Sequence, residues 1–184
     1  MNDSNEAVRC EYISAILHAA LYIVKKTTKK ELILVPQLEV IGDDNTGRVD
    51  YAIKALEELI CITESKQYAI NIGFVQNVLQ CECALQTNKK KRKAEVTFFD
   101  FLYGIVTSAT EWYIILYNSD GIFCTSKNPL KITFSEEALV ENSEEEKELF
   151  KNLKRILEVI VGILKDRLEI EKSPNRNKKQ RLSS

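Results

Sequence analysis

The sequence predicts a mixed α/β or α+β fold in which helices pack on a central sheet. Two observations predict this class. Apolar residues switch between helical and strand spacing along the chain, and the resulting order is helix, three strands, helix, strands, helix. The chain has 184 residues, of which 45% are hydrophobic, enough to bury a core within one domain. We expect residues 1–171 to form that single domain and residues 172–184 to be a basic, disordered tail.

The first half of the chain predicts one helix followed by a three-strand meander. Residues 5–26 place apolar side chains at helical spacing, and lysines gather at the C-terminal end, where cations suit the helix dipole. The pattern then changes to that of strands at 32–41, 48–55 and 59–66. Pro36 indicates an edge position or a bulge in the first strand, and residues 42–47 are rich in turn-forming Gly, Asp and Asn.

The second half predicts a helix, more strands and a long final helix. The second helix is expected at 73–85, ending in residues 86–88 before a basic loop at 89–93. Strands follow at 96–107, 112–117, 121–125 and 131–134, with a hairpin turn at 118–121. A 3.6-residue apolar stripe predicts a helix over 143–170. Ser143, with Glu146 three residues later, is typical of its N-terminal capping box.

Composition excludes several classes of function. The net charge of −1 means that affinity for nucleic acid would have to come from local basic patches. No apolar run approaches the ~20 residues that span a membrane, and no secretory signal is visible, so we expect no membrane partner and an intracellular protein. Five cysteines form no disulfide-like framework, which suits a reducing compartment. With His18 as the single histidine, a Cys/His zinc site is not expected.

The carboxylates of the meander indicate a candidate site. Side chains alternate across a strand, so Glu64 and Lys66 point to the same face. If the first hairpin turns about residues 44 and 45, Glu39 falls opposite Asp50. If the second turns about Glu57, Asp50 falls opposite Glu64. Three acids would then lie side by side, although a one-residue slip in register would destroy the pattern.

A row of acids across a sheet requires neutralisation, because like charges opposite one another destabilise strand pairing. Oxygen ligands of this kind suit Mg²⁺ or Mn²⁺. Such a metal on Asp50 and Glu64 could activate a water and stabilise charge on a phosphodiester. Lys66 could orient or deprotonate that water. Gln76 and Gln80, four residues apart, lie on one helical face and could contact substrate or position Lys66.

Six residues carry a resemblance to a known family: Asp50, Glu64, Ser65, Lys66, Gln76 and Gln80. Their pattern resembles the PD-(D/E)xK nuclease superfamily. Residues 45–51, 63–66 and 73–80 are also similar to the nuclease-like C-terminal domains of Crinkler-type effector proteins. The resemblance covers roughly residues 6–107. It implies a restriction-endonuclease-like core of helix, three-strand meander, helix and strand, here with extra C-terminal strands and a long C-terminal helix.

The resemblance also implies roles for residues. Asp50, Glu64 and the backbone carbonyl of Ser65 would bind metal, Lys66 would be catalytic, and the helix glutamines would lie at the active site. The chain departs from the family pattern in two places. Val49 stands where a proline would precede the metal-binding Asp, and a further acid is supplied by either Glu11 or Glu39.

The function expected is therefore a metal-dependent nuclease, with DNA favoured over RNA, acting as a nuclear effector. A second group is expected to bind substrate: Gln80, Lys89, Lys90, Lys91, Arg92 and Lys93. The basic clusters 89–93 and 178–181 could equally serve nuclear import, or be solvated surface. Two alternatives are a catalytically inactive nucleic-acid-binding module and a protein-interaction effector. The apolar patch 159–164 of the last helix would permit a homodimer.

Overall fold

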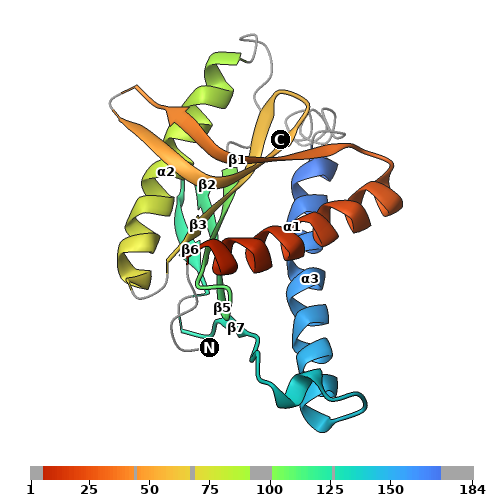
Figure 1. Cartoon of the computed structure of the whole chain (residues 1–184). Coiled ribbons are helices and arrows are strands. Elements are labelled where there is room, and N and C mark those ends of the chain that lie inside the picture. The colour runs from red at the N-terminus through yellow and green to blue at the C-terminus, as the bar shows by residue number, and fades with distance from the viewer. Residues whose placement is uncertain (1–5, 44, 67–68, 92–100, 126, 171–184) are drawn as a thin grey trace, which may run out of the picture.

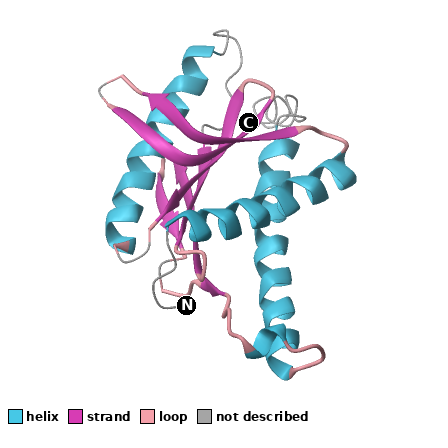
Figure 2. Cartoon of the chain, in the orientation of Figure 1, coloured by secondary structure: helices cyan, strands magenta, loops and turns pink. Residues whose placement is uncertain are grey.

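The computed structural model describes residues 6–43, 45–66, 69–91, 101–125 and 127–170. A mixed sheet, seven-stranded in this part of the chain, lies between α2 on one face and α1 with α3 on the other (Figures 1 and 2). The elements in order are α1 (Glu6–Thr28), β1 (Leu32–Ile41), β2 (Thr46–Ala55), β3 (Glu58–Ser65), α2 (Ile70–Lys91), β4 (Phe101–Thr107), β5 (Glu111–Asn118), β6 (Gly121–Cys124), β7 (Leu130–Lys131), a 3₁₀ turn η1 (Glu137–Leu139) and α3 (Glu144–Ile170). The predicted mixed α/β architecture with a long C-terminal helix is confirmed.

The sheet follows the order of the chain. Strands β1, β2 and β3 form an antiparallel meander, and β3 then pairs with β4 in parallel. Parallel neighbours need a crossover connection, and α2 lies within it. Strands β4, β5 and β6 continue in antiparallel fashion, while β7 pairs with the start of β5. The predicted succession of helix, meander, helix and strand is therefore observed.

Apolar clusters on both faces of the sheet hold the helices to it. On one face, α1 and α3 meet in a cluster that includes the fully buried Ile13, Leu17, Ile156 and Leu164. On the other face, α2 packs its apolar residues on the meander and β4. The candidate carboxylates lie near the C-terminal end of β3. Side chains from α1 on one face and from α2 on the other reach this end of the strand.

Helix α1 is long and apolar enough, by length and composition, to cross a membrane. This differs from the sequence expectation that no segment would qualify. One such helix is weak evidence, since core helices and signal sequences meet the same criterion. Here Ile13, Leu17 and Val24 are fully buried against the sheet and α3, so the apolar stripe of α1 forms part of the core.

Helix α2 is longer than predicted. It continues through residues 86–88, where it was expected to end, and Lys89 and Lys90 are helical instead of lying in a loop. The reason is that its polar residues bind the sheet. Asn88 accepts the Leu59 N–H at 2.9 Å and donates to the Leu59 carbonyl at 2.8 Å, while Thr87 donates to the Ile41 carbonyl. In a sequence, Thr and Asn are typical of the end of a helix. The strand residues that bind these two side chains and keep the helix going cannot be recognised from the sequence.

The start of α3 is capped as predicted, with one change. The Ser143 hydroxyl accepts a hydrogen bond from the Glu146 N–H at 3.0 Å. The Glu146 carboxylate accepts the N–H of Asn142 at 2.7 Å, one residue before the capping serine. Farther along, Ile160 and Leu164 are fully buried and Val161 nearly so. These three side chains of the patch 159–164 are therefore packed within the chain, whereas Val159 and Ile163 are only partly buried. A contact between copies through this patch stays a prediction.

The last turns of α3 are tied to distant parts of the chain. Arg167, 1% exposed, contacts Glu58 Oε2 at 3.2 Å and lies 5.3 Å from the Phe101 ring centroid. Lys30 Nζ donates to the Leu168 carbonyl at 2.8 Å. These contacts link the end of α3 with the start of β3 and with the segment between α1 and β1. The predicted tail 172–184, with its cluster 178–181, lies outside the described residues.

Candidate active site

Asp50 and Glu64 are brought together by the pairing of β2 with β3. Tyr51 pairs with Thr63 at this end of the two strands. Continuing the same register by one residue places Asp50 opposite Glu64, as predicted. The Asp50 carboxylate reaches one residue further, and its Oδ2 accepts the Ser65 N–H at 2.7 Å. Glu64 is only 4% exposed. A carboxylate from each strand therefore lies at the same end of the meander.

The register of β1 with β2 differs from the prediction by two residues. Glu39 pairs with Arg48, not with Asp50. The reason is the turn: the Gly42 N–H donates to the Asn45 carbonyl at 2.8 Å, so the hairpin turns one residue earlier than assumed. Glu39 is exposed on the outer part of the hairpin, and the predicted row of three acids is reduced to two.

Gln37 occupies the position opposite Asp50, and sequence reasoning missed it. Its Nε2 donates to Asp50 Oδ1 at 3.1 Å, and its backbone has φ of 51°, a left-handed value that costs energy for a non-glycine residue. Val49 packs on the α2 side while Tyr51 packs on the α1 side, so strand alternation breaks at Asp50. The irregularity indicated by Pro36 is the sequence signal that could have found this residue.

Glu64 is held by two partners on the α2 side of the sheet. Lys66 Nζ lies 3.0 Å from Glu64 Oε1, and Gln80 Nε2 donates to Glu64 Oε2 at 2.8 Å. The same Gln80 nitrogen reaches the Arg48 carbonyl at 3.0 Å. The prediction that Glu64 and Lys66 share a face is confirmed. Burial of this carboxylate is tolerable because both oxygens are paired with protein groups.

Two residues of α2 bring this helix close to the sheet, and neither was predicted. A Cβ at Gly73 would lie 2.9 Å from Lys66 Cγ, so only glycine leaves room for the lysine stem. One turn later, the fully buried Asn77 donates to the carbonyls of Ile62 and Ile105 at 3.2 and 3.4 Å. It sits against Gly104, where a Cβ would collide with its amide. Because Asn77 and Gly104 are far apart in sequence, no local sequence pattern predicts that they pack together.

Gln76 lies on α2 between Gly73, where a Cβ would crowd Lys66, and Gln80, which binds Glu64. Its Oε1 is buried and has no hydrogen-bond partner within the described chain, and the same holds for Gln80 Oε1. Unpaired buried acceptors are costly and call for a donor. Together with the two carboxylates they supply the hard oxygen atoms that Mg²⁺ or Mn²⁺ and its bound waters prefer. The donor types present therefore suit such a metal.

No third acid joins the pair. Among the described residues, no group of three or more His, Cys, Asp and Glu side chains could hold a metal ion. Glu11 is exposed on α1, where its charge adds to the effect of burial, the main cause, in raising the pKa of Tyr51. Arg9, 7% exposed, donates through Nε to the Ser65 hydroxyl at 3.3 Å and brings a buried cation to this strand end. The role of the Ser65 carbonyl stays a prediction.

Comparison with known proteins adds a structural likeness only. No family model and no curated protein matches the chain. Among solved structures it is similar to the type IIG restriction endonuclease BpuSI, with 16% sequence identity and a TM-score of 0.49. The similarity covers 84% of this chain and 16% of that one, so the chain spans a small part of that protein's length. A likeness of this degree assigns no activity, and the resemblance to Crinkler-type domains stays a prediction.

The described part of the basic run, Lys89 and Lys90, lies away from the carboxylates. Asn88 binds Leu59, near the start of β3, whereas Glu64 is near its end. Ten helical residues separate Gln80 from Lys90, a rise of about 15 Å. Lys90 pairs with Asp43 at 2.7 Å. The side chain of Lys91, together with Arg92 and Lys93, lies outside the described residues, and substrate binding by this run stays a prediction.

The two cysteines that flank the core between β3 and α2, Cys61 and Cys81, offer no nucleophile. Cys61 and Cys81 are fully buried, and burial raises the pKa of the Cys61 thiol to about 12 and that of Cys81 well above its usual value. Both therefore remain protonated thiols at neutral pH, and a thiol is a weak nucleophile. The reactive groups that the site offers are two carboxylates, one lysine amine and amide oxygens. This set suits activation of water better than formation of a covalent intermediate.

Proposed function

We propose that this chain is a divalent-metal-dependent nuclease that hydrolyses phosphodiester bonds in nucleic acid, with DNA favoured over RNA. One observation carries the proposal: Asp50 lies opposite Glu64, and Lys66 Nζ lies 3.0 Å from Glu64 Oε1. Paired carboxylates beside an amine match the chemistry of hydrolysis, which needs a metal site and a group that handles a proton. The fold is also the one implied by the sequence resemblance to PD-(D/E)xK nucleases.

Each residue would have a defined task. Asp50 and Glu64 would hold Mg²⁺ or Mn²⁺, which when bound supplies an activated water and neutralises phosphate charge. Lys66 would orient the water or take its proton, and Gln80 holds Glu64 in place. The buried oxygen of Gln76 would accept a hydrogen bond from water. Helix α2 begins four residues after Lys66, and its positive N-terminal end favours a phosphate there.

Cleavage of supercoiled plasmid DNA and labelled RNA with Mg²⁺ or Mn²⁺ tests the proposal. We expect the wild-type chain to cut in the presence of metal and to stop when EDTA removes it. Asp50→Asn should lower the rate at least about a hundredfold, because it removes a metal-binding charge while keeping an acceptor for the Ser65 N–H. The matched control is Asp43→Asn, which removes a carboxylate on the same hairpin that is paired with Lys90.

The outcomes separate clearly. If wild-type protein leaves both nucleic acids intact with either metal, the proposal is wrong. It is also wrong if Asp50→Asn cuts as fast as Asp43→Asn. Equal cutting of DNA and RNA would keep the nuclease and overturn the preference for DNA.

Gln37→Gly should weaken metal binding while preserving the fold. The change removes the amide that holds Asp50 Oδ1 and places glycine where φ is 51°. Loss of a group that orients a metal ligand typically costs about 10–100-fold in affinity, so we expect a Mn²⁺ Kd raised at least about tenfold by calorimetry. Because glycine adopts positive φ without strain, thermal stability should be unchanged or slightly higher.

Gln37→Asn is the matched variant for this test. Asparagine keeps an amide and tolerates left-handed backbone, so it separates loss of the hydrogen bond from change in the backbone. A Mn²⁺ affinity that is the same in wild type and Gln37→Gly would show that Gln37 does not position Asp50. Destabilisation by Gln37→Gly would contradict the strain assigned to this position.

A second candidate is a nucleic-acid-binding module without turnover. It is favoured by the absence of a third acid among the described residues and by the protein partners that already occupy both oxygens of Glu64. In this case duplex DNA would be bound but not cut, and the double variant Asp50→Ala/Glu64→Ala would bind with unchanged affinity. Loss of affinity in the double variant with metal present would favour the metal-dependent enzyme.

A nuclear effector role extends the proposal. It is supported by the basic clusters 89–93 and 178–181 and by the resemblance to Crinkler-type domains. Fusion of the full chain to a fluorescent protein, with and without neutral substitutions in each cluster, tests the location. Retention in the nucleus after both clusters are neutralised would remove the basis for import through them.

A further inference from the structure

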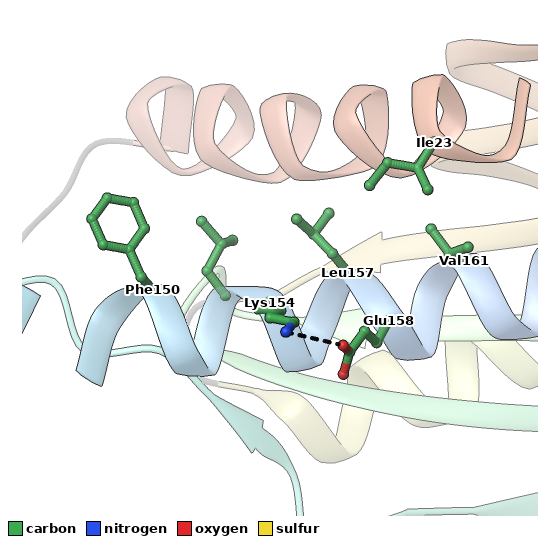
Figure 3. A pocket seen from close by; sticks show the side chains of 7 residues that line it. Ile23, Phe150, Lys154, Leu157, Glu158 and Val161 are labelled. Atoms are coloured by element: carbon green, nitrogen blue, oxygen red, sulfur yellow. Dashed lines mark ion pairs between the residues drawn. The ribbon is translucent and has the colours of Figure 1, made fainter. Parts of the chain in front are cut away.

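The N-terminal half of α3 carries an apolar surface that the rest of the described chain leaves open. Phe150 is 60% exposed, and Leu153 and Leu157 are only partly buried, whereas Ile160 and Leu164 farther along the helix are fully buried. Figure 3 shows Phe150, Leu157 and Val161 of α3 directed toward α1, whose Ile23 points toward them. These residues line a groove of about 360 Å³ between the two helices. Leu139 and Val140, 83% and 60% exposed, are two further exposed apolar residues in the segment just before α3.

Charged residues flank Phe150 at equal distances along α3. Glu146 precedes it by four residues and Lys154 follows it by four, so the three side chains form one row on the helix. Lys154 has an intrahelical neighbour in Glu158, but at 3.9 Å this contact is long and both side chains are well exposed. Glu146 uses Oε2 to accept the Asn142 N–H, and a carboxylate can accept further hydrogen bonds.

This arrangement is complementary to itself. When two copies of α3 pack antiparallel about a two-fold axis at Phe150, each Phe150 meets its counterpart. Glu146 of each copy then faces Lys154 of the other, so two ion pairs flank one aromatic contact. Moving the axis to Lys154 would instead oppose two lysines and place Phe150 against Glu158. The charge pattern therefore selects one register, as an isologous interface requires.

We infer that the chain forms a two-fold dimer in which α3 of one copy lies in the groove between α1 and α3 of the other, centred on Phe150. A second copy is favoured over nucleic acid, because the first turn of α3 carries Glu144, Glu145 and Glu146, which repel phosphates. The surface overlaps the predicted patch 159–164 only at Val161, which is 8% exposed. The dimer does not depend on the nuclease proposal, and its test uses no activity.

Sedimentation of the full chain over a wide range of concentration tests the dimer. We expect a monomer–dimer equilibrium in wild type. Phe150→Ala should raise the dimer Kd at least about tenfold, since an aromatic residue at the centre of an interface carries much of the binding energy. Glu146→Lys and Lys154→Glu should each raise it about tenfold, because each variant opposes like charges twice.

The double variant Glu146→Lys/Lys154→Glu decides the register. It restores both ion pairs with reversed sign, so the dimer Kd should return close to the wild-type value. Glu148→Lys is the matched control: it makes the same charge change on an exposed residue that lies off the row and should leave the Kd unchanged. Circular dichroism checks that each variant keeps its helices. A wild type that stays monomeric throughout, or a double variant no tighter than the singles, overturns the proposal.

Discussion

Lys66→Met should lower the rate of metal-dependent DNA cleavage by about 100–10,000-fold, the usual contribution of a group that transfers or orients a proton. Methionine keeps the length of the stem, which contacts Gly73, and removes the amine that lies 3.0 Å from Glu64 Oε1. Lys66→Arg keeps a cation beside Glu64 but not one that can lose its proton near neutral pH. If Lys66 acts as a base, the arginine variant should be nearly as slow as the methionine variant, and if it only stabilises charge, arginine should recover much of the rate.

A matched ion pair elsewhere provides the control. Lys131 lies 2.8 Å from Glu111 at the protein surface, and exposed pairs contribute about 0–1 kcal/mol to stability. Lys131→Met should therefore leave cleavage unchanged. Thermal unfolding of each variant separates loss of activity from loss of fold, because Lys66→Met also leaves the buried Glu64 with a single protein partner. A Lys66→Met protein that is folded and cuts at the wild-type rate would remove Lys66 from the mechanism.

Gly104→Ala should destabilise the fold by about 3 kcal/mol, at the upper end of the range for an overpacked core. An alanine Cβ would collide with Oδ1 of Asn77 and lie 3.0 Å from its Cγ. Asn77 would have to give up its hydrogen bonds to Ile62 and Ile105, which hold α2 against β3 and β4. Denaturant unfolding of the purified variant measures the effect. Since Gln80 is on the same helix, its contact with Glu64 should be weakened as well.

Two further variants make this test specific. Gly162→Ala makes the same change in α3, where a Cβ meets no atom within 4 Å, and should stabilise the protein by up to about 1 kcal/mol through helix propensity. In the double variant Gly104→Ala/Asn77→Ala the collision is absent. It should be more stable than the sum of the two single effects. A Gly104→Ala protein as stable as wild type, or strict additivity in the double variant, would contradict the packing described here.

Local patterns predicted most of the fold because they depend on neighbours in sequence. The change of apolar period located α1, the meander and α3, and the turn residues located the hairpin at 118–121. The end of α2 was wrong because Thr87 and Asn88 bind strands that are distant in sequence. The first hairpin register was wrong because it depends on a single backbone hydrogen bond within the turn.

The site was predictable where strand parity and register sufficed. Those two rules placed Glu64 with Lys66 and Asp50 opposite Glu64. They could not find Gln37, whose contact with Asp50 depends on the same shifted register. Nor could they find Asn77 and Arg9, which reach strands from two different helices. Such contacts follow from how the layers pack, and no spacing along the chain encodes them.

The pairing of α1 with α3 also has a consequence for the order in which the chain is made. About 115 residues separate the end of α1 from the start of α3, so a ribosome adding about 5–20 residues per second leaves α1 without its partner for about 6–23 seconds. The meander and α2 emerge in that interval and can form the carboxylate site from contacts only 13 to 16 residues apart. The apolar stripe of α1 is covered completely only when the final helix joins the sheet in packing on it. During synthesis, chaperones should therefore bind mainly to α1. Truncations that remove α3 should leave part of the apolar stripe of α1 permanently exposed.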